Sequence, residues 1–259
     1  MRSLVVLATC LAACSTPAAQ HPSAPTARVV VLISANAEWK ALGATLAGKT
    51  LHASAYGEWT ETTLGTVPAI LLHGGYGKVQ AAGSTQWAID TFHPELVVNL
   101  GTAGGFGDTI AVGDVIMATK TVIYDIVERM GDPDEAIADF TTTIDTRAWP
   151  ARLASRVKPA VLVSADQDLS PDALDQLRTK YHAPAGDWES GAIAYVAARN
   201  KVRVLILRAI SDVIDKTGHD ATYGSVATWQ AETAKAMTML VSLLGDALPE
   251  FLDSTRPGT

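Results

Sequence analysis

Cysteine is almost absent from this sequence, and that absence narrows the chemistry available to it. Of the 259 residues only Cys10 and Cys14 are cysteines, and both lie near the N-terminus. The remainder is therefore expected to contain no disulfide, thiol nucleophile or Cys-ligated metal. The six histidines show no metal-ligand spacing. A net charge of −7 without a basic run argues against a nucleic-acid partner.

The N-terminus also lacks an apolar run long enough to cross a bilayer, which takes about 20 residues. Met1 to Ser3 carries a positive charge and Leu4 to Ala13 is apolar apart from one threonine, a pattern that predicts a secretory signal over residues 1–13. The sequence Leu-Ala-Ala-Cys ending at Cys14 resembles the lipobox of bacterial lipoproteins, where the cysteine is lipidated. The alternative is an ordinary cleaved signal that happens to contain a cysteine.

Residues 14–27 are rich in Pro, Ala and Ser and predict a disordered tether. Together with lipidation at Cys14, this predicts a cell-envelope protein on a lipid anchor, facing the periplasm in a Gram-negative organism. The membrane is then contacted through the anchor only.

The remainder, residues 28–259, predicts one α/β domain. With 48% hydrophobic residues the chain can build a large core. Apolar runs predict strands over 28–34, 52–64, 67–73, 96–100, 112–126 (one long strand or a pair), 160–164 and 202–207. Helical spacing predicts helices over 36–46, 78–92, 171–181, 189–199 and 225–244, the last capped by Ser225. Strands that alternate with helices favour a single domain with a mainly parallel, mixed β-sheet flanked by helices. The polar segment 127–146 is predicted to be a loop near the mouth of the site.

Carboxylates follow several of these strands, at the sheet edge where α/β proteins bind ligands. Asp212 follows the run 202–207 with Arg208 and Ser211 beside it, and it acts either as a helix cap or as a catalytic acid. Glu38 follows the first strand and is either a base or a solvated first-turn residue. Glu189 opens a helix after Trp188 and either accepts hydrogen bonds or complements the helix dipole.

Two glycine-rich segments also follow strands. Residues 74–78 match neither the dinucleotide fingerprint nor the Walker pattern, so no cofactor is predicted. Residues 101–105 are predicted to form a turn whose small side chains let a flat ligand lie against the backbone.

These motifs, in order, resemble the purine nucleoside phosphorylase superfamily, and specifically its 5′-methylthioadenosine/S-adenosylhomocysteine nucleosidase branch. The resemblance runs from about residue 29 to 244. It is carried by Gly-Tyr-Gly-Lys-Val at 75–79, Asn-Leu-Gly-Thr-Ala-Gly-Gly at 99–105, Val-Gly-Asp-Val at 112–115, Trp-Glu-Ser-Gly-Ala-Ile-Ala at 188–194 and Arg-Ala-Ile-Ser-Asp at 208–212.

The resemblance implies hydrolysis of the N-glycosidic bond of a purine nucleoside. In that reaction Asp212 would protonate N7 of the base, Glu38 would activate water and Glu189 would bind the ribose hydroxyls. The implied substrate-binding set also contains Thr102, Ala103, Gly104, Leu169, and Ser211 and Arg208 as supports of Asp212. The chemistry gives independent reasons for these residue types, because a purine anion is a poor leaving group and an acid at N7 lowers the barrier.

Hydrolysis is favoured over phosphorolysis by the first loop. Residues 34–38 contain no Arg to hold phosphate and supply Glu38, whose charge would repel it. Two other readings stay open, a lipoprotein that binds a nucleoside without cleaving it and an inactive paralogue.

Two positions depart from the family pattern. Asp168 stands where the family has an aromatic residue that stacks on the purine, and Trp188 stands where Met is usual. Our hypothesis is that Trp188 takes over part of the stacking and Asp168 contacts a polar edge of the base; plain core packing is the alternative for Trp188.

Assembly is suggested less directly. Trp39, Trp87, Trp149 and Trp229 either form an exposed apolar patch or fill the core. The resemblance adds a homodimer as the assembly to test.

Overall fold

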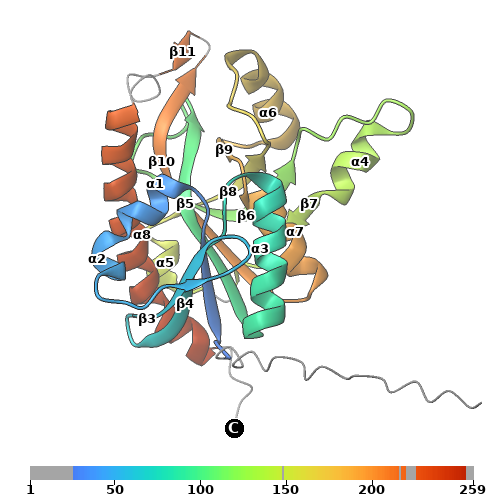
Figure 1. Cartoon of the computed structure of the whole chain (residues 1–259). Coiled ribbons are helices and arrows are strands. Elements are labelled where there is room, and N and C mark those ends of the chain that lie inside the picture. The colour runs from blue at the N-terminus through green and yellow to red at the C-terminus, as the bar shows by residue number, and fades with distance from the viewer. Residues whose placement is uncertain (1–25, 148, 216, 220–225, 255–259) are drawn as a thin grey trace, which may run out of the picture.

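One mixed β-sheet of 11 strands organises the computed structural model (Figure 1). The described residues are 26–147, 149–215, 217–219 and 226–254, so the predicted signal, Cys14 and Ser225 lie outside them. The strands are β1 (Val29–Ile33), β2 (His52–Ala53), β3 (Glu58–Leu64), β4 (Val67–His73), β5 (Leu96–Phe106), β6 (Val115–Ile123), β7 (Thr141–Thr143), β8 (Lys158–Ser164), β9 (Ala185–Asp187), β10 (Arg203–Asp215) and β11 (Gly218–His219). The helices are α1 (Asn36–Ala41), α2 (Gly43–Leu46), α3 (Gly77–Phe92), α4 (Pro133–Asp139), α5 (Ala151–Ala154), α6 (Leu174–Tyr181), preceded by a short 3-10 turn (Pro171–Ala173), α7 (Ser190–Arg199) and α8 (Val226–Ser254).

The sheet closes on itself at one end. Its order is β11-β10-β6-β8-β9-β5-β1-β4-β3-β2, and β10 also pairs with β5. Strands β5, β10, β6, β8 and β9 therefore form a ring, while β1, β4, β3 and β2 continue outward from β5 as an open sheet. Strand β1 pairs in parallel with both β4 and β5, so its carboxyl end lies beside that of β4 and beside Leu100 of β5, which continues to Phe106.

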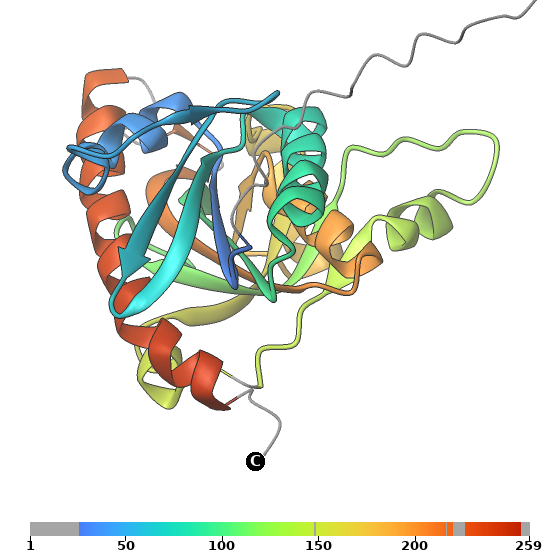
Figure 2. The ribbon, with the colours of Figure 1, turned by 60° about the horizontal axis from the view of Figure 1, so that its bottom comes forward.

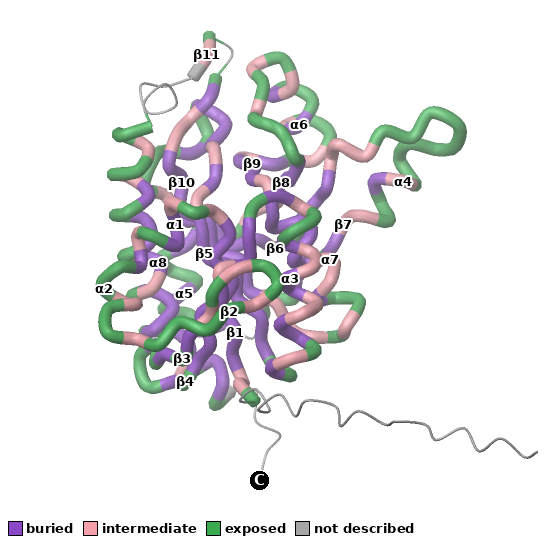
Figure 3. Tube along the Cα trace, in the orientation of Figure 1, coloured by how far each residue is buried: buried purple, intermediate pink, exposed green. Residues whose placement is uncertain are grey.

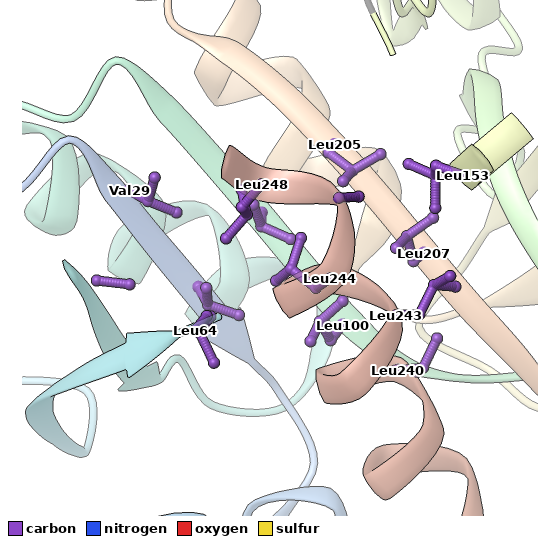
Figure 4. Close-up of a cluster of buried hydrophobic side chains, with 14 of the residues drawn as sticks. Val29, Leu64, Leu100, Leu153, Leu205, Leu207, Leu240, Leu243, Leu244 and Leu248 are labelled. Carbon is purple, nitrogen blue, oxygen red and sulfur yellow. The ribbon is translucent and has the colours of Figure 1, made fainter. Parts of the chain in front are cut away.

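Helices cover both sides of the sheet. Helix α8 lies along one side, and α3 and α7 lie together on the other (Figures 1 and 2). A burial map shows the strands of the centre buried along most of their length (Figure 3). The largest apolar cluster fills the space between α8 and the sheet, where leucines of α8 meet Leu205 and Leu207 of β10 and Leu100 of β5 (Figure 4). Within the described part of the chain, no helix has the length and apolar character to cross a membrane.

The predicted α/β architecture is confirmed. Strand β1 is buried at every position, as expected for a Val, Leu and Ile run with neighbours on both faces. The predicted helices over 78–92, 171–181 and 189–199 are present to within a few residues. The long segment 112–126 forms the single strand β6 rather than a pair.

Two strands are longer than predicted, and both extend into the site. The turn expected at 101–105 is wrong: these residues continue β5, because β10 pairs with them on one side and β9 pairs with Gly104 and Gly105 on the other. Strand β10 likewise continues to Asp215. Asp212 therefore lies inside a strand, which rules out the helix-cap interpretation.

Other corrections concern the helices. The segment 36–46 forms two short helices, interrupted at Leu42. Helix α8 runs ten residues beyond the predicted end at Leu244, because Ala247, Leu248 and Phe251 are also buried. Segment 127–146 is not one loop near the mouth of the site: it contains α4 and β7, projects from the body (Figure 1, right) and contributes no residue to the cavity described below.

Candidate active site

A cavity of about 440 Å³ opens at the carboxyl ends of the central parallel strands. Its walls come from segments far apart in the sequence, since β1, β4, β5, β8 and β10 all end near it. The lining residues are Ala35, Glu38, Tyr76, Thr102, Ala103, Gly104, Gln167, Asp168, Leu169, Gly186, Asp187, Trp188, Glu189, Ser211, Asp212, Ile214, Val226 and Trp229. All of the predicted purine and ribose residues are among them, with the exception of Arg208.

Asp212 reaches the cavity because β10 contains a bulge. In the pairing of β10 with β5, Ile210 lies opposite Ala103 and Asp212 opposite Gly104, so Ser211 is an extra residue. A bulge changes which face the following side chains take. Ile210 and Val213, three residues apart, accordingly pack in one apolar cluster, whereas Asp212 turns into the cavity.

Ser211 also holds the carboxylate of Asp212. Its hydroxyl donates to Asp212 Oδ1 at 2.6 Å. The other oxygen, Oδ2, faces Gly104, where a Cβ would come within 3.4 Å of it. The bulge residue therefore both directs Asp212 to the cavity and orients its carboxylate there.

Glu38 lies on α1 and is buried, with 2% of its surface exposed. Its Oε2 accepts a hydrogen bond from the backbone N–H of Ala35 at 3.1 Å. Its Oε1 accepts from both the backbone N–H of Thr102 at 2.6 Å and the Thr102 hydroxyl at 3.0 Å. A solvated first-turn role is therefore wrong, and the small residues predicted beside a ligand also fix this carboxylate.

Glu189 precedes α7 and is almost fully buried. Its Oε1 accepts a hydrogen bond from the backbone N–H of Gly77, where α3 begins, at 3.1 Å. Burial is the main cause that raises the pKa of Glu189 to about 8; the charge of Arg208 opposes this shift, and the charges of Asp187 and Glu38 add to it. A substantial fraction of Glu189 is therefore protonated near neutral pH.

Arg208 was predicted to support Asp212, and its placement corrects that prediction. The side chain is fully buried behind the cavity. Its Nε lies 2.7 Å from Asp187 Oδ2, its Nη2 donates to Glu189 Oε2 at 3.3 Å, and its Nη1 lies 3.8 Å from Glu38 Oε1. Arg208 thus serves these three carboxylates, because on β10 it precedes the bulge and faces away from Asp212.

Gly101 makes this arrangement possible. It lies opposite Arg208 in the pairing of β5 with β10, and a Cβ there would come 1.9 Å from Arg208 Nη1 and 2.7 Å from Glu38 Oε1. The guanidinium therefore reaches Glu38 by passing over a residue that has no side chain.

Asp187 was missed by sequence reasoning. It lies at the end of β9, directly before Trp188, and is 8% exposed. Its Oδ1 accepts hydrogen bonds from the Ser164 hydroxyl at 2.6 Å and from the Ser190 backbone N–H at 3.2 Å, and its Oδ2 accepts from the Ser190 hydroxyl. Ser190, in the motif at 188–194, was the available signal, since a buried hydroxyl needs a partner.

The aromatic side chains of the cavity form a stack. Tyr76 and Trp188 lie with ring centroids 4.6 Å apart and planes 28° from parallel, and both line the cavity. Burial, together with the charges of Glu189, Asp168 and Asp166, raises the pKa of Tyr76 to about 12, so its hydroxyl stays protonated. Tyr76 was not predicted, although it is the only aromatic side chain in its glycine-rich motif.

The four tryptophans considered for an exposed patch, Trp39, Trp87, Trp149 and Trp229, do not form one. Trp39 and Trp149 are buried in the large apolar cluster and Trp87 packs against the cluster under α3. Trp229 of α8 lines the cavity.

The wall beyond β8 carries Asp168 and Leu169, as predicted. This wall is tied to the start of α3, because Asp166 Oδ1 accepts from the Lys78 backbone N–H at 2.8 Å. The Lys78 ammonium also forms an ion pair with Asp125, whose other carboxylate oxygen accepts from the Asp166 N–H. Among the described residues no group of three His, Cys, Asp or Glu side chains is arranged to hold a metal ion.

The geometry suits a reaction in which charge moves across a bound molecule. Acidic side chains on separate walls can give a proton to one end of a ligand and take one from water at the other, and a buried acid between them can bind hydroxyls. The lining supplies these groups as Asp212, Glu38 and Glu189.

Comparison with known proteins agrees with this reading. The family model described as Phosphorylase superfamily matches residues 28–244. A protein of Geobacillus sp. named 5′-methylthioadenosine/S-adenosylhomocysteine nucleosidase is 29% identical over 199 residues, which cover 72% of this chain and 86% of that protein. A protein of Bacillus velezensis with the same name is 31% identical over 174 residues, which cover 62% of this chain and 75% of that protein.

Solved structures share the fold. The Campylobacter jejuni 5′-methylthioadenosine/S-adenosylhomocysteine nucleosidase superposes with a TM-score of 0.69 at 20% identity, covering 85% of this chain and 99% of that one. Futalosine hydrolase of Helicobacter pylori gives a TM-score of 0.70 at 18% identity, covering 86% of this chain and 98% of that one. At these identities the likeness concerns architecture alone.

Proposed function

The chain belongs to the phosphorylase superfamily, and on that premise we propose that it hydrolyses the N-glycosidic bond of a purine nucleoside of the 5′-methylthioadenosine or S-adenosylhomocysteine type. It is an N-glycosyl hydrolase, a nucleosidase that releases the free base and a ribose derivative. The observation that carries the proposal is the meeting of Asp212, Glu38 and Glu189, from β10, α1 and the start of α7, around one cavity.

Asp212 acts at the base. Bond cleavage leaves the bonding electrons on the purine, and a proton delivered to N7 stabilises that leaving group. The Ser211 hydroxyl on Asp212 Oδ1 orients the carboxyl group for this transfer.

Glu38 acts on the attacking water. Its carboxylate is fixed by Ala35 and Thr102, and Arg208 Nη1 lies 3.8 Å from its Oε1. That nitrogen is buried and makes no hydrogen bond to a described residue. Arg208 Nη1 is therefore a positive charge behind the wall, and the carboxylate of Glu38, which lines the cavity, takes the proton of the water as that water attacks the sugar.

Glu189 binds the ribose hydroxyls. In its ionised form it stabilises positive charge that develops on the sugar ring. Its hydrogen bonds from Gly77 and Arg208 fix both carboxylate oxygens on the wall that also carries Trp188. Thr102, Ala103 and Gly104 of β5 also line the cavity and offer backbone and small side chains to a flat ligand.

Water rather than phosphate is the nucleophile. The described lining contains no Lys or Arg, and it contains five carboxylates: Glu38, Asp168, Asp187, Glu189 and Asp212. The nearest guanidinium, Arg208, is already engaged by three of them. A phosphate ion would enter without a cation to pair with, which is costly in a buried site.

The test is release of free base by the purified mature protein from methylthioadenosine, S-adenosylhomocysteine, adenosine, inosine and guanosine, with and without phosphate. We expect release from at least one adenine nucleoside at a rate that phosphate does not change. Binding of a nucleoside without release would favour the nucleoside-binding lipoprotein, and absence of any affinity would favour an inactive paralogue.

We also propose that the protein is a lipoprotein anchored through Cys14, in the cell envelope. Support comes from the sequence of the first 27 residues, which lie almost wholly outside the described part of the chain. Expression of the full chain with a palmitate analogue should label the native protein, and Cys14→Ala should abolish the label and move the activity to the soluble fraction. Label retained in Cys14→Ala would refute lipidation at this residue.

We further propose a homodimer. Tyr76 and Val79 at the start of α3 and Val226 at the start of α8 are exposed large apolar side chains, and two of them line the cavity mouth. A second copy of the chain would remove this surface from water. Light scattering should report twice the mass of the mature chain, and Val79→Asp should lower it; a monomer at micromolar concentration would refute the proposal.

A further inference from the structure

Asp187 is the buried carboxylate that the proposed mechanism leaves without a role. It lines the cavity, but its recorded hydrogen bonds and ion pair point inward, to Ser164, Ser190 and Arg208. Each carboxylate oxygen is engaged, and the partners come from β8, α7 and β10. A side chain held from three elements has little freedom to move toward a ligand. Asp187 must therefore influence the reaction through the side chains that it binds.

What Asp187 holds is Arg208. The guanidinium Nε lies 2.7 Å from Asp187 Oδ2 and also donates to the Ser190 hydroxyl at 3.0 Å. With Nε fixed on that side, the planar guanidinium has one remaining orientation, with Nη2 toward Glu189 and Nη1 toward Glu38. The same contact thus decides where both terminal nitrogens point.

The support behind this pair is itself fixed. The Ser190 hydroxyl lies 3.4 Å from Asn99 Oδ1, and the Asn99 amide donates to the backbone carbonyl of Leu32 at 3.0 Å. The Ser164 hydroxyl accepts from the backbone N–H of Gly191 at 2.9 Å. All of these groups are buried, so water does not compete for the hydrogen bonds.

We propose that Asp187 is a positioning residue: by holding Arg208 through Nε it sets the orientation of Glu189 and fixes the guanidinium charge 3.8 Å from Glu38, and so couples the ribose-binding group to the water-activating group. The inference rests on the proposed function for the roles of those two glutamates. A buried ion pair is weak support for stability, because desolvation offsets much of the attraction. We therefore attribute the role of the Asp187–Arg208 pair to the orientation that it gives the guanidinium.

The charge of Asp187 provides a readout that a purely structural role would not move. The charged or titratable groups that face Glu189 are Arg208 from β10, Asp187 from β9, Glu38 from α1 and Tyr76 before α3. Asp187 and Glu38 raise the pKa of Glu189, and Arg208 lowers it. Removal of the charge of Asp187 without a change in shape should therefore lower the pKa of Glu189.

The experiment is Asp187→Asn in the mature protein, which keeps the size of the side chain and its capacity to bind both serines. We expect kcat to fall about 10- to 100-fold, as for groups displaced by a fraction of an ångström to about 1 Å, while the protein stays folded. The pH dependence of kcat/KM and the side-chain carboxyl carbon shift of Glu189, assigned by its loss in Glu189→Gln, should both show the Glu189 transition at lower pH. Asp187→Glu restores the charge and should return the transition toward its native position.

Ser164→Ala is the matched control. It removes one hydrogen bond to Asp187 and no charge, so we expect a smaller loss of kcat and an unchanged Glu189 transition. Should Asp187→Asn not fold, Ser164→Ala and Ser190→Ala carry the test, and native kcat in both would overturn the proposal. Native kcat and an unmoved transition in folded Asp187→Asn would also overturn it. The carbon shift is measured without substrate, so failure of the proposed function, seen as no base release by the native protein, remains distinguishable.

Discussion

Two buried regions lie on opposite sides of β10, and they are built in opposite ways. On one side Leu205 and Leu207 pack under α8 in a cluster of aliphatic side chains (Figure 4). On the other, Arg208 is equally buried but lies among Asp187, Glu38 and Glu189. The first region gains free energy from every apolar surface removed from water. In the second region, attraction between the buried charges offsets the cost of removing them from water, so the net gain in stability is small.

The comparison teaches that burial alone does not identify what a region contributes. Substitutions under α8 should lower stability and leave the chemistry of the folded protein intact. Substitutions around the cavity should do the reverse. Four measurements test this difference between the two regions.

The largest effect is expected from Asp212→Asn. The amide cannot deliver a proton to the base, so kcat should fall by about 10² to 10⁴, with a melting temperature within a few degrees of native. Base release and thermal unfolding check the two halves of this statement. Asp215→Asn, on the same strand but exposed and outside the cavity lining, is the matched control and should keep native activity. Activity within tenfold of native for Asp212→Asn would contradict the assigned role.

The second is Leu207→Ala, which opens a cavity in the apolar cluster. The free energy of unfolding should fall by about 2 to 5 kcal/mol, while kcat measured below the new melting temperature should stay within twofold of native. Urea unfolding followed by fluorescence gives the first quantity. Leu51→Ala, at an exposed position, should change neither. A fall in kcat without a loss of stability would show that the two regions are not separable.

The third is the pH dependence of stability through Glu189. Its folded-state pKa of about 8 lies above the ordinary value of 4.5, so the folded protein binds this proton more tightly than the unfolded chain does. The associated stability is present below about pH 4.5 and is lost as pH rises toward 8. Glu189→Gln should therefore flatten the decline in melting temperature across that window. Glu250→Gln, an exposed glutamate on α8, should leave the decline as it is.

The smallest is Trp188→Ala. Loss of a ring that lines the cavity should raise the Michaelis constant for the best nucleoside about fivefold, since base–aromatic stacking is worth about 1 kcal/mol at the low end of its range. Initial rates over a range of substrate concentrations measure it, and Trp188→Phe should recover part of the loss. An unchanged Michaelis constant in the alanine variant would leave Trp188 with a packing role against Tyr76.

The sequence predicted what depends on local pattern and on ordered motifs. Strand β1, helix α3 and the placement of Glu38, Glu189 and Asp212 at one sheet edge could all be read from apolar runs and from the residues that follow them. The bulge at Ser211 could not, because it exists only in the pairing of β10 with β5.

The role of Arg208 was misread for the same reason. In the sequence its nearest acidic neighbour is Asp212, whereas in the fold its ion-pair partners are Glu38, Asp187 and Glu189. Glycines gave a similar error: the run 101–105 has the composition of a turn, yet Gly101 continues a strand because it pairs with β10, and Arg208 occupies the space that a side chain there would fill. Contacts between distant segments decided each of these cases.

The extra residue in β10 decides which face of the strand carries Asp212. If Ser211 were kept but paired regularly with Gly104, each following residue of β10 would move one place along β5. Asp212 would then share the face of Ile210, inside an aliphatic cluster, and the cavity would receive its neighbour instead. A shift of one residue in the pairing of β10 with β5 therefore decides whether the same amino acids place the acid in the cavity or in the apolar core.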